Sequence, residues 1–439
     1  MAALHANTEL ETLEPQHELQ LRGPSDLRVE LVDSVDRFAE LQQPWKVLYA
    51  KDRESGFYLS WEWIEALFTD YAPQVRILAV RANDGAYLAF FPISTRTRWS
   101  RSTQKFQTVL EPAGRAALSE LTGILCDPDH EEEVVPALAR TIAALPWTRF
   151  SMRYEPTGRR SKLLLDALPA DRFKGRFRAY LINEDTVDNL NCPQVHLPAD
   201  HDQWLAGLSA NTRQKIRRFS RRHLDSGAWH ITQVSDDTLT RDLDITLDMW
   251  TQRWVAEKGR SAARRTTSIY RHMFETAHRQ GMLHLPILWS GDTPLVAHAC
   301  IADTSRGHVH FVAAGRSLEN DQPNSGLLLH SESIRWAIDA GFRLYDFGHG
   351  DEAYKISLGG KNKRLQYLFV ERRSLSPLDA IDTFNLSSAV RKIRSLIRHG
   401  KTREARCALA ELSKIVEAHQ LPDHDITHLS SKLEADPHG

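Results

Sequence analysis

Apolar positions along the chain alternate between strand-like and helix-like periods, and they predict two successive α/β units. The first unit covers residues 27–182. It opens with the strand-like segment LRVELV and continues with two apolar runs, VRILAVRA and AYLAFFPIS. Asn83-Asp84-Gly85 separates these runs and is a strong hairpin signal. Residues 131–145 have the pattern of a helix, although Pro136 counts against its early part.

The second predicted unit covers residues 202–373 and repeats this order of elements. A basic helix (209–224) comes first, and two further helices precede three apolar strands, MLHLPILWS, PLVAHACIAD and HVHFVAAG. A helix then runs from Ser325 to Ala340 and stops at Gly341, a residue type that readily takes the left-handed conformation at a helix end. The shared order of elements predicts a duplicated fold.

Three segments lie outside these units. Residues 1–26 carry five acidic residues and one arginine, which predicts a disordered acidic tail. Residues 183–201 contain loop formers and two prolines and are the expected linker. Residues 374–439 are expected to form a basic helical extension with a disordered end. Its most basic part, 391–406, either contacts a partner or is a solvated helical hairpin.

Composition narrows the class of protein. Of the 439 residues, 41% are hydrophobic and 26% are charged, and the net charge is -1. This is an ordinary globular composition, with no global argument for nucleic acid or membrane binding. Four cysteines without a CxxC pair argue against a disulfide framework or zinc site and fit a reducing compartment. Neither a membrane-spanning run nor a secretory signal is recognised, so a cytoplasmic protein is expected.

The stretch from Arg343 to Arg373 is the strongest candidate for chemistry. It predicts a short strand ending near Asp346, a turn broken by Gly348 and Gly350, and a brief helix carrying Tyr354 and Lys355. Loops after strand ends are where α/β proteins place their functional groups. Asp346 is a candidate base, Tyr354 a hydrogen-bond donor and Lys355 an anion ligand. The alternative is an internal ion pair of Asp346 with Lys355 or Arg343.

Two helix starts and two histidines add further candidates. The loop of Asn324, Ser325 and Gly326 enters a helix directly after a strand, so its free N–H groups form an anion site, or an ordinary helix cap. The basic helix is either a solvated face or attracted to phosphates; its cations are Arg213, Lys215, Arg217, Arg218, Arg221 and Arg222. His298 and His310 lie on predicted strands, where each is either a general base or a structural residue. Metal-ligand and DNA-binding motifs are not recognised, so neither metal nor DNA is expected.

The order PNSGLLL, a helix ending at Gly341, then YDFGHGDEAYK and a last strand resembles one family. It is similar to the GNAT-related acetyltransferases of the CelD/BcsL type, which are associated with bacterial cellulose and exopolysaccharide synthesis. These in turn resemble the Fem-type transferases with two GNAT-like domains. NTRQKIRRFSRR, the helix with Trp250 and Trp254, and PLVAHACIA agree in order. The resemblance is firm over residues 202–373 and weaker over 27–182.

The resemblance implies an α/β (α+β) fold: two tandem GNAT-like domains with mixed, mostly antiparallel central sheets, followed by the C-terminal helical extension. It also implies acyl transfer from a thioester, with acyl-CoA (acetyl-CoA) as co-substrate. In such proteins the pyrophosphate of coenzyme A docks at a [QR]xxGx[GA] loop. The corresponding residues here are Gln322, Asn324, Ser325 and Gly326, with the glycine one place late and Leu327 in the last position.

The expected reaction is direct transfer within a ternary complex, with His310 or Asp346 as the base that accepts a proton from the acceptor. The residues assigned to substrate contacts are Arg213, Arg217, Trp254, His298, Gly348 and Gly350. The expected acceptor is an amine or hydroxyl of a small molecule or of a cell-envelope or exopolysaccharide precursor. One alternative is a Fem-like transferase that uses aminoacyl-tRNA, with RNA on the basic helix. A second is a non-catalytic scaffold that kept the fold.

Overall fold

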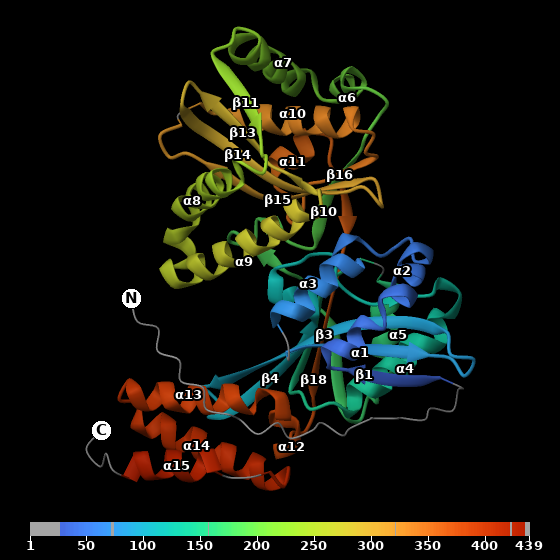
Figure 1. Cartoon of the computed structure of the whole chain (residues 1–439), viewed down its shortest axis with the longest axis vertical. Coiled ribbons are helices and arrows are strands. Elements are labelled where there is room, and N and C mark those ends of the chain that lie inside the picture. The colour runs from blue at the N-terminus through green and yellow to red at the C-terminus, as the bar shows by residue number, and fades with distance from the viewer. Residues whose placement is uncertain (1–26, 72–73, 157, 321, 422–423, 435–439) are drawn as a thin grey trace.

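The computed structural model describes residues 27–71, 74–156, 158–320, 322–421 and 424–434, so the predicted N-terminal tail lies outside the described residues. Two eight-stranded sheets, each covered by helices, lie one above the other in Figure 1. The first sheet has the strand order β1-β2-β3-β4-β6-β18-β7, with β5 paired to β3. Its strands are β1 (Arg28–Val32), β2 (Val75–Arg81), β3 (Tyr87–Ser100), β4 (Lys105–Pro112), β5 (Leu125–Cys126), β6 (Arg149–Glu155), β7 (Phe173–Phe177) and β18 (Gln366–Arg372).

The second sheet has the strand order β11-β13-β14-β15-β16-β10-β17, with β12 paired to β14. Its strands are β10 (Asn191–His196), β11 (Trp229–Gln233), β12 (Leu283–His284), β13 (Pro286–Ser290), β14 (Thr293–Asp303), β15 (His308–Arg316), β16 (Leu344–Asp346) and β17 (Lys361–Arg364). The two short strands β8 (Leu181–Ile182) and β9 (Val187–Asp188) pair by themselves.

Each sheet is antiparallel except at one equivalent place. In the first, β4 runs parallel to β6, and in the second, β15 runs parallel to β16. In both cases the chain crosses over through helical segments between the two parallel strands. The mixed, mostly antiparallel sheets and the repeated topology confirm the predicted fold class.

The two units exchange strands. Beside β6 in the first sheet lies β18, which is the last strand of the second unit in sequence. Beside β16 in the second sheet lies β10, which comes from the segment after the first unit. The expected linker, 183–201, therefore contains a strand of the second sheet. The closing strand expected in the second unit forms, but it belongs to the first sheet. Both segments satisfy their backbone groups in the neighbouring sheet, a pairing that local sequence pattern does not encode.

Helices complete both layers. In the first unit, α4 and α5 cover one sheet face and α1 to α3 cover the β1–β3 half of the other. The predicted helix at 131–145 is observed, because Pro136 costs α4 only one early backbone hydrogen bond. The helices of the first unit are α1 (Val35–Ala39), α2 (Gln42–Lys51), α3 (Trp61–Tyr71), α4 (Glu131–Ala144) and α5 (Arg159–Ala167). Those of the second are α6 (His201–Gly207), α7 (Ala210–Phe219), α8 (Leu239–Lys258), α9 (Arg260–Arg279), α10 (Ser325–Asp339) and α11 (Ala353–Ser357).

The two units are docked through a shared core and a buried arginine. Trp63 and Leu67 of α3 belong to the same apolar cluster as Met273 and Phe274 of α9. Arg306, at the turn between β14 and β15, reaches into the first unit and donates hydrogen bonds to its backbone carbonyls. The relative position of the two sheets is thus fixed by both apolar and polar contacts.

The extension after β18 is helical, as predicted. Its helices are α12 (Pro377–Ala380), α13 (Leu386–Arg398), α14 (Thr402–Ala418) and α15 (His424–Glu434). They pack on Trp99 and Phe106 at the far ends of β3 and β4, and Asp382 forms a buried ion pair with Arg76 of β2. The expected hairpin therefore has a further helix, α15, beside it (Figure 1).

Candidate active site

The parallel pair β15/β16 opens at its end. Pairing covers only three residues and stops at His310 and Asp346, while β15 continues to Arg316. A register shift against β14, where Ala299 faces Ala313 but Cys300 faces Phe311, makes a bulge at Val312. Bulges re-aim backbone groups and recur beside active sites. Polar backbone groups of β15 are therefore offered to a ligand at the point where the two strands separate.

The turn after β16 passes close to this bulge. Gly348 has φ of 70°, and a Cβ there would lie 3.0 Å from the Phe311 carbonyl oxygen. Only glycine permits this combination of a left-handed backbone and close approach. Gly350, with φ of 92°, is the second glycine of the turn. The two glycines that the sequence singled out thus shape the wall of the opening.

His310 and Asp346 lie together and are both buried. The Asp346 carboxylate accepts hydrogen bonds from Gln194 Nε2 at 2.7 Å and from the Gly348 N–H at 2.8 Å. His310 Nδ1 lies 3.9 Å from Asp346 Oδ2, and its buried Nε2 has no hydrogen-bond partner among the described residues. Tyr58 of the first unit packs against the His310 ring. Asp346 therefore holds the turn, and His310 retains one free ring nitrogen.

Lys355 holds the same turn from the other side. Its buried Nζ donates to the backbone oxygens of His349 at 2.7 Å and Gly350 at 3.0 Å and pairs with Glu352 at 2.9 Å. No ion pair with Asp346 forms among the described residues. Tyr354, one residue earlier, is 39% exposed and stacks on His330. The structure thus engages Lys355 in loop geometry and leaves the face of the Tyr354 ring partly accessible.

A carboxylate of the first unit completes the site. Glu120 accepts a hydrogen bond from the His349 backbone N–H at 3.1 Å and contacts ring Nδ1 of the same histidine. The His349 side chain remains 39% exposed. A carboxylate on Nδ1 fixes the ring and leaves Nε2 as the nitrogen that can accept a proton, as in catalytic histidine pairs. Burial and the nearby cations Lys355 and Arg115 lower the pKa of His349 to about 3, so the ring is neutral and can take up a proton from a bound amine or hydroxyl only during the transfer itself.

Tyr154 of β6 adjoins this histidine. It has φ of 61° at a bulge between β6 and β18, an unusual conformation for an aromatic residue. Its ring centroid lies 5.3 Å from that of His349, and its hydroxyl accepts a hydrogen bond from Asn189. Arg115 stacks over the other part of the ring at 4.8 Å. Strained residues concentrate at functional sites, so the first unit forms part of this one.

The N-terminus of α10 matches the predicted anion site. Asn324 is the N-cap residue, but it makes no side-chain cap hydrogen bond. Ser325 is fully buried, and its hydroxyl links Asn320 to the Gln322 carbonyl. A Cβ on Gly326 would meet nothing within 4 Å. The Ser325 N–H donates to the Gln322 carbonyl at 3.4 Å, and the space beside Gly326 at the positive end of the α10 dipole fits a phosphate.

The other predicted contacts lie outside this cluster. Arg213 donates to carbonyls at the end of α6, whereas Arg217 is exposed on α7. Trp254 of α8 is partly buried beneath Arg253 and Lys258. His298 is in the core against His330, and burial lowers its pKa to about 3. The structure therefore does not bring these residues to the β15/β16 opening.

Sequence reasoning missed the contributions of Glu120, Tyr58, Tyr154 and Gln194. They come from other elements than the 343–373 stretch, and only tertiary contacts identify them. His349 lies between the two glycines of the turn, and the sequence alone assigns it no role. A positive φ at Tyr154 or a carboxylate facing His349 leaves no signal in local sequence.

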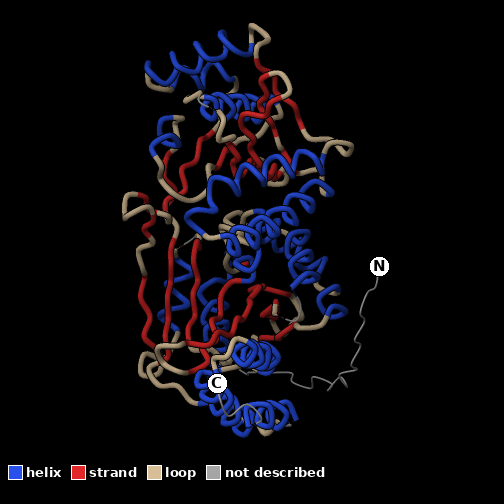
Figure 2. Tube along the Cα trace, turned by 90° about the vertical axis from the view of Figure 1, so that its left-hand side faces the viewer, coloured by secondary structure: helices blue, strands red, loops and turns tan. Residues whose placement is uncertain are grey.

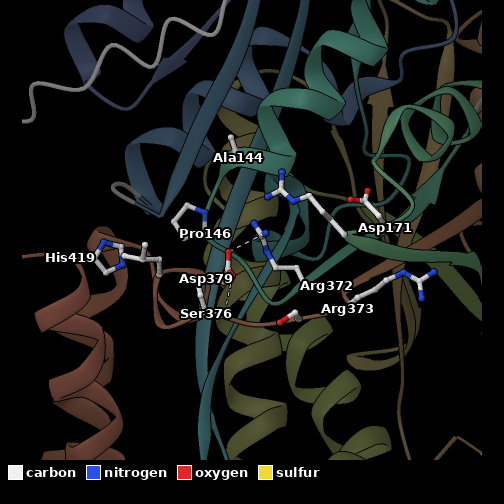
Figure 3. A pocket seen from close by; sticks show the side chains of 11 residues that line it. Ala144, Pro146, Asp171, Arg372, Arg373, Ser376, Asp379 and His419 are labelled. Carbon is white, nitrogen blue, oxygen red and sulfur yellow. Dashed lines mark hydrogen bonds and ion pairs between the residues drawn. The ribbon is translucent and has the colours of Figure 1, made fainter.

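A separate cavity of about 630 Å³ lies between the first unit and the C-terminal extension. Figure 3 shows its lining, which includes Arg372, Arg373 and Asp379. The Arg372 guanidinium donates to the Ala143 and Leu145 carbonyls and pairs with Asp379 at 3.0 Å. Its charge is thus engaged in capping α4 and anchoring α12. No residue of the β15/β16 opening lines this cavity.

Comparison with known proteins identifies the domain that contains the β15/β16 opening. Residues 210–356 match the family described as "Acetyltransferase (GNAT) domain". The structure titled "Crystal structure of FemX" is similar to this chain with a TM-score of 0.52 and 12% identity, over 74% of this chain and 95% of that one. No curated protein sequence matches the chain significantly.

Two further structures score lower. L-PGS from Bacillus licheniformis has 11% identity and a TM-score of 0.44, over 82% of this chain and 97% of that one. A tandem GNAT protein from the clavulanic acid biosynthesis pathway has 11% identity and a TM-score of 0.44, over 79% and 99%.

Residues 210–356 therefore form a GNAT-type acetyltransferase domain, and this domain supports an acyltransferase activity. Domains of this family typically use acetyl-CoA. In overall fold the chain is similar to FemX. In the described part of the chain, no helix has the length and apolar character needed to span a bilayer, and no cluster of metal-binding side chains occurs.

Proposed function

We propose that the protein transfers an acyl group, most simply acetyl, from acyl-CoA to an amine or hydroxyl held between the two units. The observation that carries this proposal is the β15/β16 opening. It contains an oriented histidine, and the helix that follows β15 in the chain, α10, begins without a side-chain cap. The helix N-terminus can hold the diphosphate of the donor, and the histidine can accept the proton of the acceptor.

The proposed reaction needs no covalent enzyme intermediate. The acceptor nitrogen or oxygen attacks the thioester carbonyl, its proton passes to a base, and the C–S bond breaks to release the CoA thiol. Backbone N–H groups at the Val312 bulge are placed to stabilise the oxyanion that forms on the carbonyl oxygen. His349 is the proposed base, and His310 is the second candidate because its Nε2 is unoccupied.

Calorimetric titration with acetyl-CoA and with free CoA tests donor binding. Gly326→Glu places a carboxylate where a Cβ meets only open space, so the fold should persist while the anion is repelled. Gly207→Glu is a matched control, because that glycine also has open space around its Cβ and lies in α6. Binding that is retained in Gly326→Glu, or absent from the wild type at millimolar ligand, would contradict the proposal.

The finer identity of the acceptor rests on the resemblance to the CelD/BcsL type, and we propose a cell-envelope or exopolysaccharide precursor, including those of cellulose synthesis. A cytoplasmic location is consistent with this proposal, because the four cysteines are free and thiols persist in reducing compartments.

The alternative donor is aminoacyl-tRNA. Exposed cations on α7, among them Lys215 and Arg217, favour this donor. Phe219 at the end of α7 packs in the same cluster as Leu328 of α10, so α7 lies against the helix that begins at the proposed donor site. Salt-sensitive tRNA binding that is lost in a Lys215→Gln/Arg217→Gln variant, without any CoA binding, would select this alternative.

A further inference from the structure

The uncovered half of the first sheet is strongly basic. Helices α1 to α3 cover the β1–β3 half of this face, and the remaining strands of the sheet are β4, β6, β18 and β7. Figure 2 shows long strands along one side of the molecule. Paired residues on neighbouring strands point to the same side, so the registers place the following residues on this face: Arg96, Arg98, Glu111, Arg149, Arg153, Tyr367, Glu371, Lys174, Arg176 and Arg178. We call this set the basic face.

Its arginines are held in place by aromatic rings. Arg153 lies over the rings of Tyr180 and Tyr367 at 5.6 and 5.7 Å, and Arg178 lies over Phe369 at 4.7 Å. Stacked guanidinium groups lose little freedom when they bind, and their N–H fork matches carboxylate and phosphate oxygens. The basic face is therefore preorganised for anions.

Positive charge on the basic face exceeds what its acids balance. Glu111 pairs with Arg96 at 2.7 Å and approaches Arg153 at 3.8 Å. For Arg98, Lys174 and Arg178, no carboxylate lies within ion-pair distance in the described part of the chain. Burial is the main reason that the pKa of Arg96 is lowered, and the neighbouring cations Arg98 and Arg153 add to this effect. An anionic ligand would offset the excess positive charge.

The basic face leads to the candidate active site. Arg153 is followed by the bulged Tyr154, whose ring contacts His349 and lies beneath Arg115. The Nε atoms of Arg115 and Arg153 are buried without a hydrogen-bond partner. Buried donors without a partner are costly, so these two groups favour a ligand that presents acceptor oxygens to them.

From this placement we propose that the basic face binds an acceptor that is rich in hydroxyl groups and carries carboxylate or phosphate groups. This inference rests on the proposed function, because it supplies the acceptor side of the same reaction. The reactive amine or hydroxyl would lie at His349 and the anionic groups along Arg153, Arg176 and Arg178. The donor is not the expected occupant, since the helix N-terminus suited to its diphosphate belongs to the second unit.

A nucleic acid fits the basic face less well. Bases are recognised by stacking on free aromatic rings, but the rings of Tyr367 and Phe369 are already covered by guanidinium groups. Glu111 and Glu371 would repel a uniform chain of phosphates, whereas carboxylates readily accept hydrogen bonds from hydroxyl groups. A ligand with a few negative groups on a hydroxyl-rich scaffold would pair its negative groups with the cations of the basic face and its hydroxyl groups with the acids.

Calorimetry with two probes tests the proposal: a short oligogalacturonate for carboxylates, and glucose 1,6-bisphosphate for phosphates. Binding of either supports it and identifies the anionic group. The Kd should rise about tenfold or more in an Arg176→Gln/Arg178→Gln variant, which loses two charge-assisted contacts. The matched control is Arg140→Gln, an exposed arginine of α4 on the opposite side of the sheet, which should leave Kd unchanged.

Three results would overturn the inference: no binding of either probe, equal weakening by Arg140→Gln, or tighter binding of an RNA oligonucleotide through the same arginines. Titration of each variant with CoA separates this inference from the proposed function. Intact CoA binding without probe binding contradicts only the basic face as an acceptor site. If the wild-type protein does not bind CoA, this result contradicts the proposed function itself.

Discussion

Glu120 of the first unit and His349 of the second form a carboxylate–histidine pair across the junction between the two sheets. Neither unit has this pair by itself. The carboxylate fixes the ring through Nδ1 and the turn through the backbone N–H, and it thereby couples domain docking to the geometry of a proton acceptor. Duplication of the fold consequently has a chemical result: the first unit supplies part of the candidate active site of the second.

Replacing His349 with Ala should lower kcat for acetyl transfer about 100- to 10,000-fold, the usual contribution of a general base. Glu120→Gln should cost less, because the amide still contacts the ring but no longer stabilises the imidazolium that forms on proton transfer. Burial lowers the pKa of His349 to about 3, so neither protein should show an acid limb from this histidine near neutral pH. CoA release measured over a range of pH provides both values.

Glu133→Gln is the control for this pair. Glu133 also contacts a histidine, His130, but on the exposed start of α4. Its loss should change neither kcat nor the pH profile. If His349→Ala retained wild-type turnover while His310→Ala abolished it, His310 would be the base instead.

Gly348→Ala tests the close approach at the bulge. The new Cβ would lie 3.0 Å from the Phe311 carbonyl oxygen at a φ of 70°. Gly227→Ala has a similar φ of 73° but nothing within 4 Å. Both variants should lose about 1–2 kcal/mol from the left-handed backbone, and only Gly348→Ala should lose turnover as well. Thermal unfolding and kcat of the two proteins separate strain from site geometry, and equal turnover in both would count against this placement of the site.

Local sequence patterns predicted most of the helices and strands, but they did not predict the exchange of strands between the two units. The hairpin at Asn83-Asp84-Gly85 formed as expected, with β2 paired to β3 around Gly85 at φ of 94°. The start of α10 and the glycine turn after Asp346 were also found, because caps and turns are set by residues close in sequence. These features gave the fold class and one half of the site.

The other half depends on contacts between distant segments. β10 has two residues, Cys192 and Pro193, that looked like part of a linker, yet it pairs with β16 and β17 in the second sheet. Strand partners are chosen by the hydrogen-bonding edge that tertiary packing leaves open, which a single sequence does not record. For the same reason the sequence did not identify Glu120, because its partner His349 is 229 residues away.

Arg306 is expected to lock the two units together. Its guanidinium donates to the Tyr49 and Asp52 carbonyls and to Ser55 Oγ, and it stacks on the Tyr49 ring at 4.0 Å. Arg306→Gln should lower the free energy of unfolding by about 2–4 kcal/mol, because buried acceptors lose charged donors. Limited proteolysis should then cleave between the units. Arg343→Gln, an exposed arginine that donates to the Arg306 carbonyl within the second unit, should leave the proteolysis pattern unchanged.

Buried histidines should make the second unit sensitive to acid. Burial lowers the pKa of His284 and of His298 to about 3, whereas histidine in an unfolded chain titrates near 6.5. Below pH ~6.5 the unfolded state therefore binds protons at these histidines, whereas the native state does not. Each histidine should remove about 1.4 kcal/mol of stability per pH unit as pH falls from ~6.5 toward 3, and nothing above ~7.

His284→Phe provides the test, because it keeps the stacking on Trp336, at 3.6 Å between ring centroids, and removes the titrating group. The free energy of unfolding, measured with urea between about pH 5 and 7.5, should depend less steeply on pH in this variant, by the contribution of one histidine. His230→Phe is the control, since His230 also stacks on a tryptophan, Trp289, but is exposed. The exposed ring can be protonated without a burial cost, so its removal should leave the slope as it is. An unchanged slope in His284→Phe would mean that the native core accepts the proton after all, and that acid lability has another source.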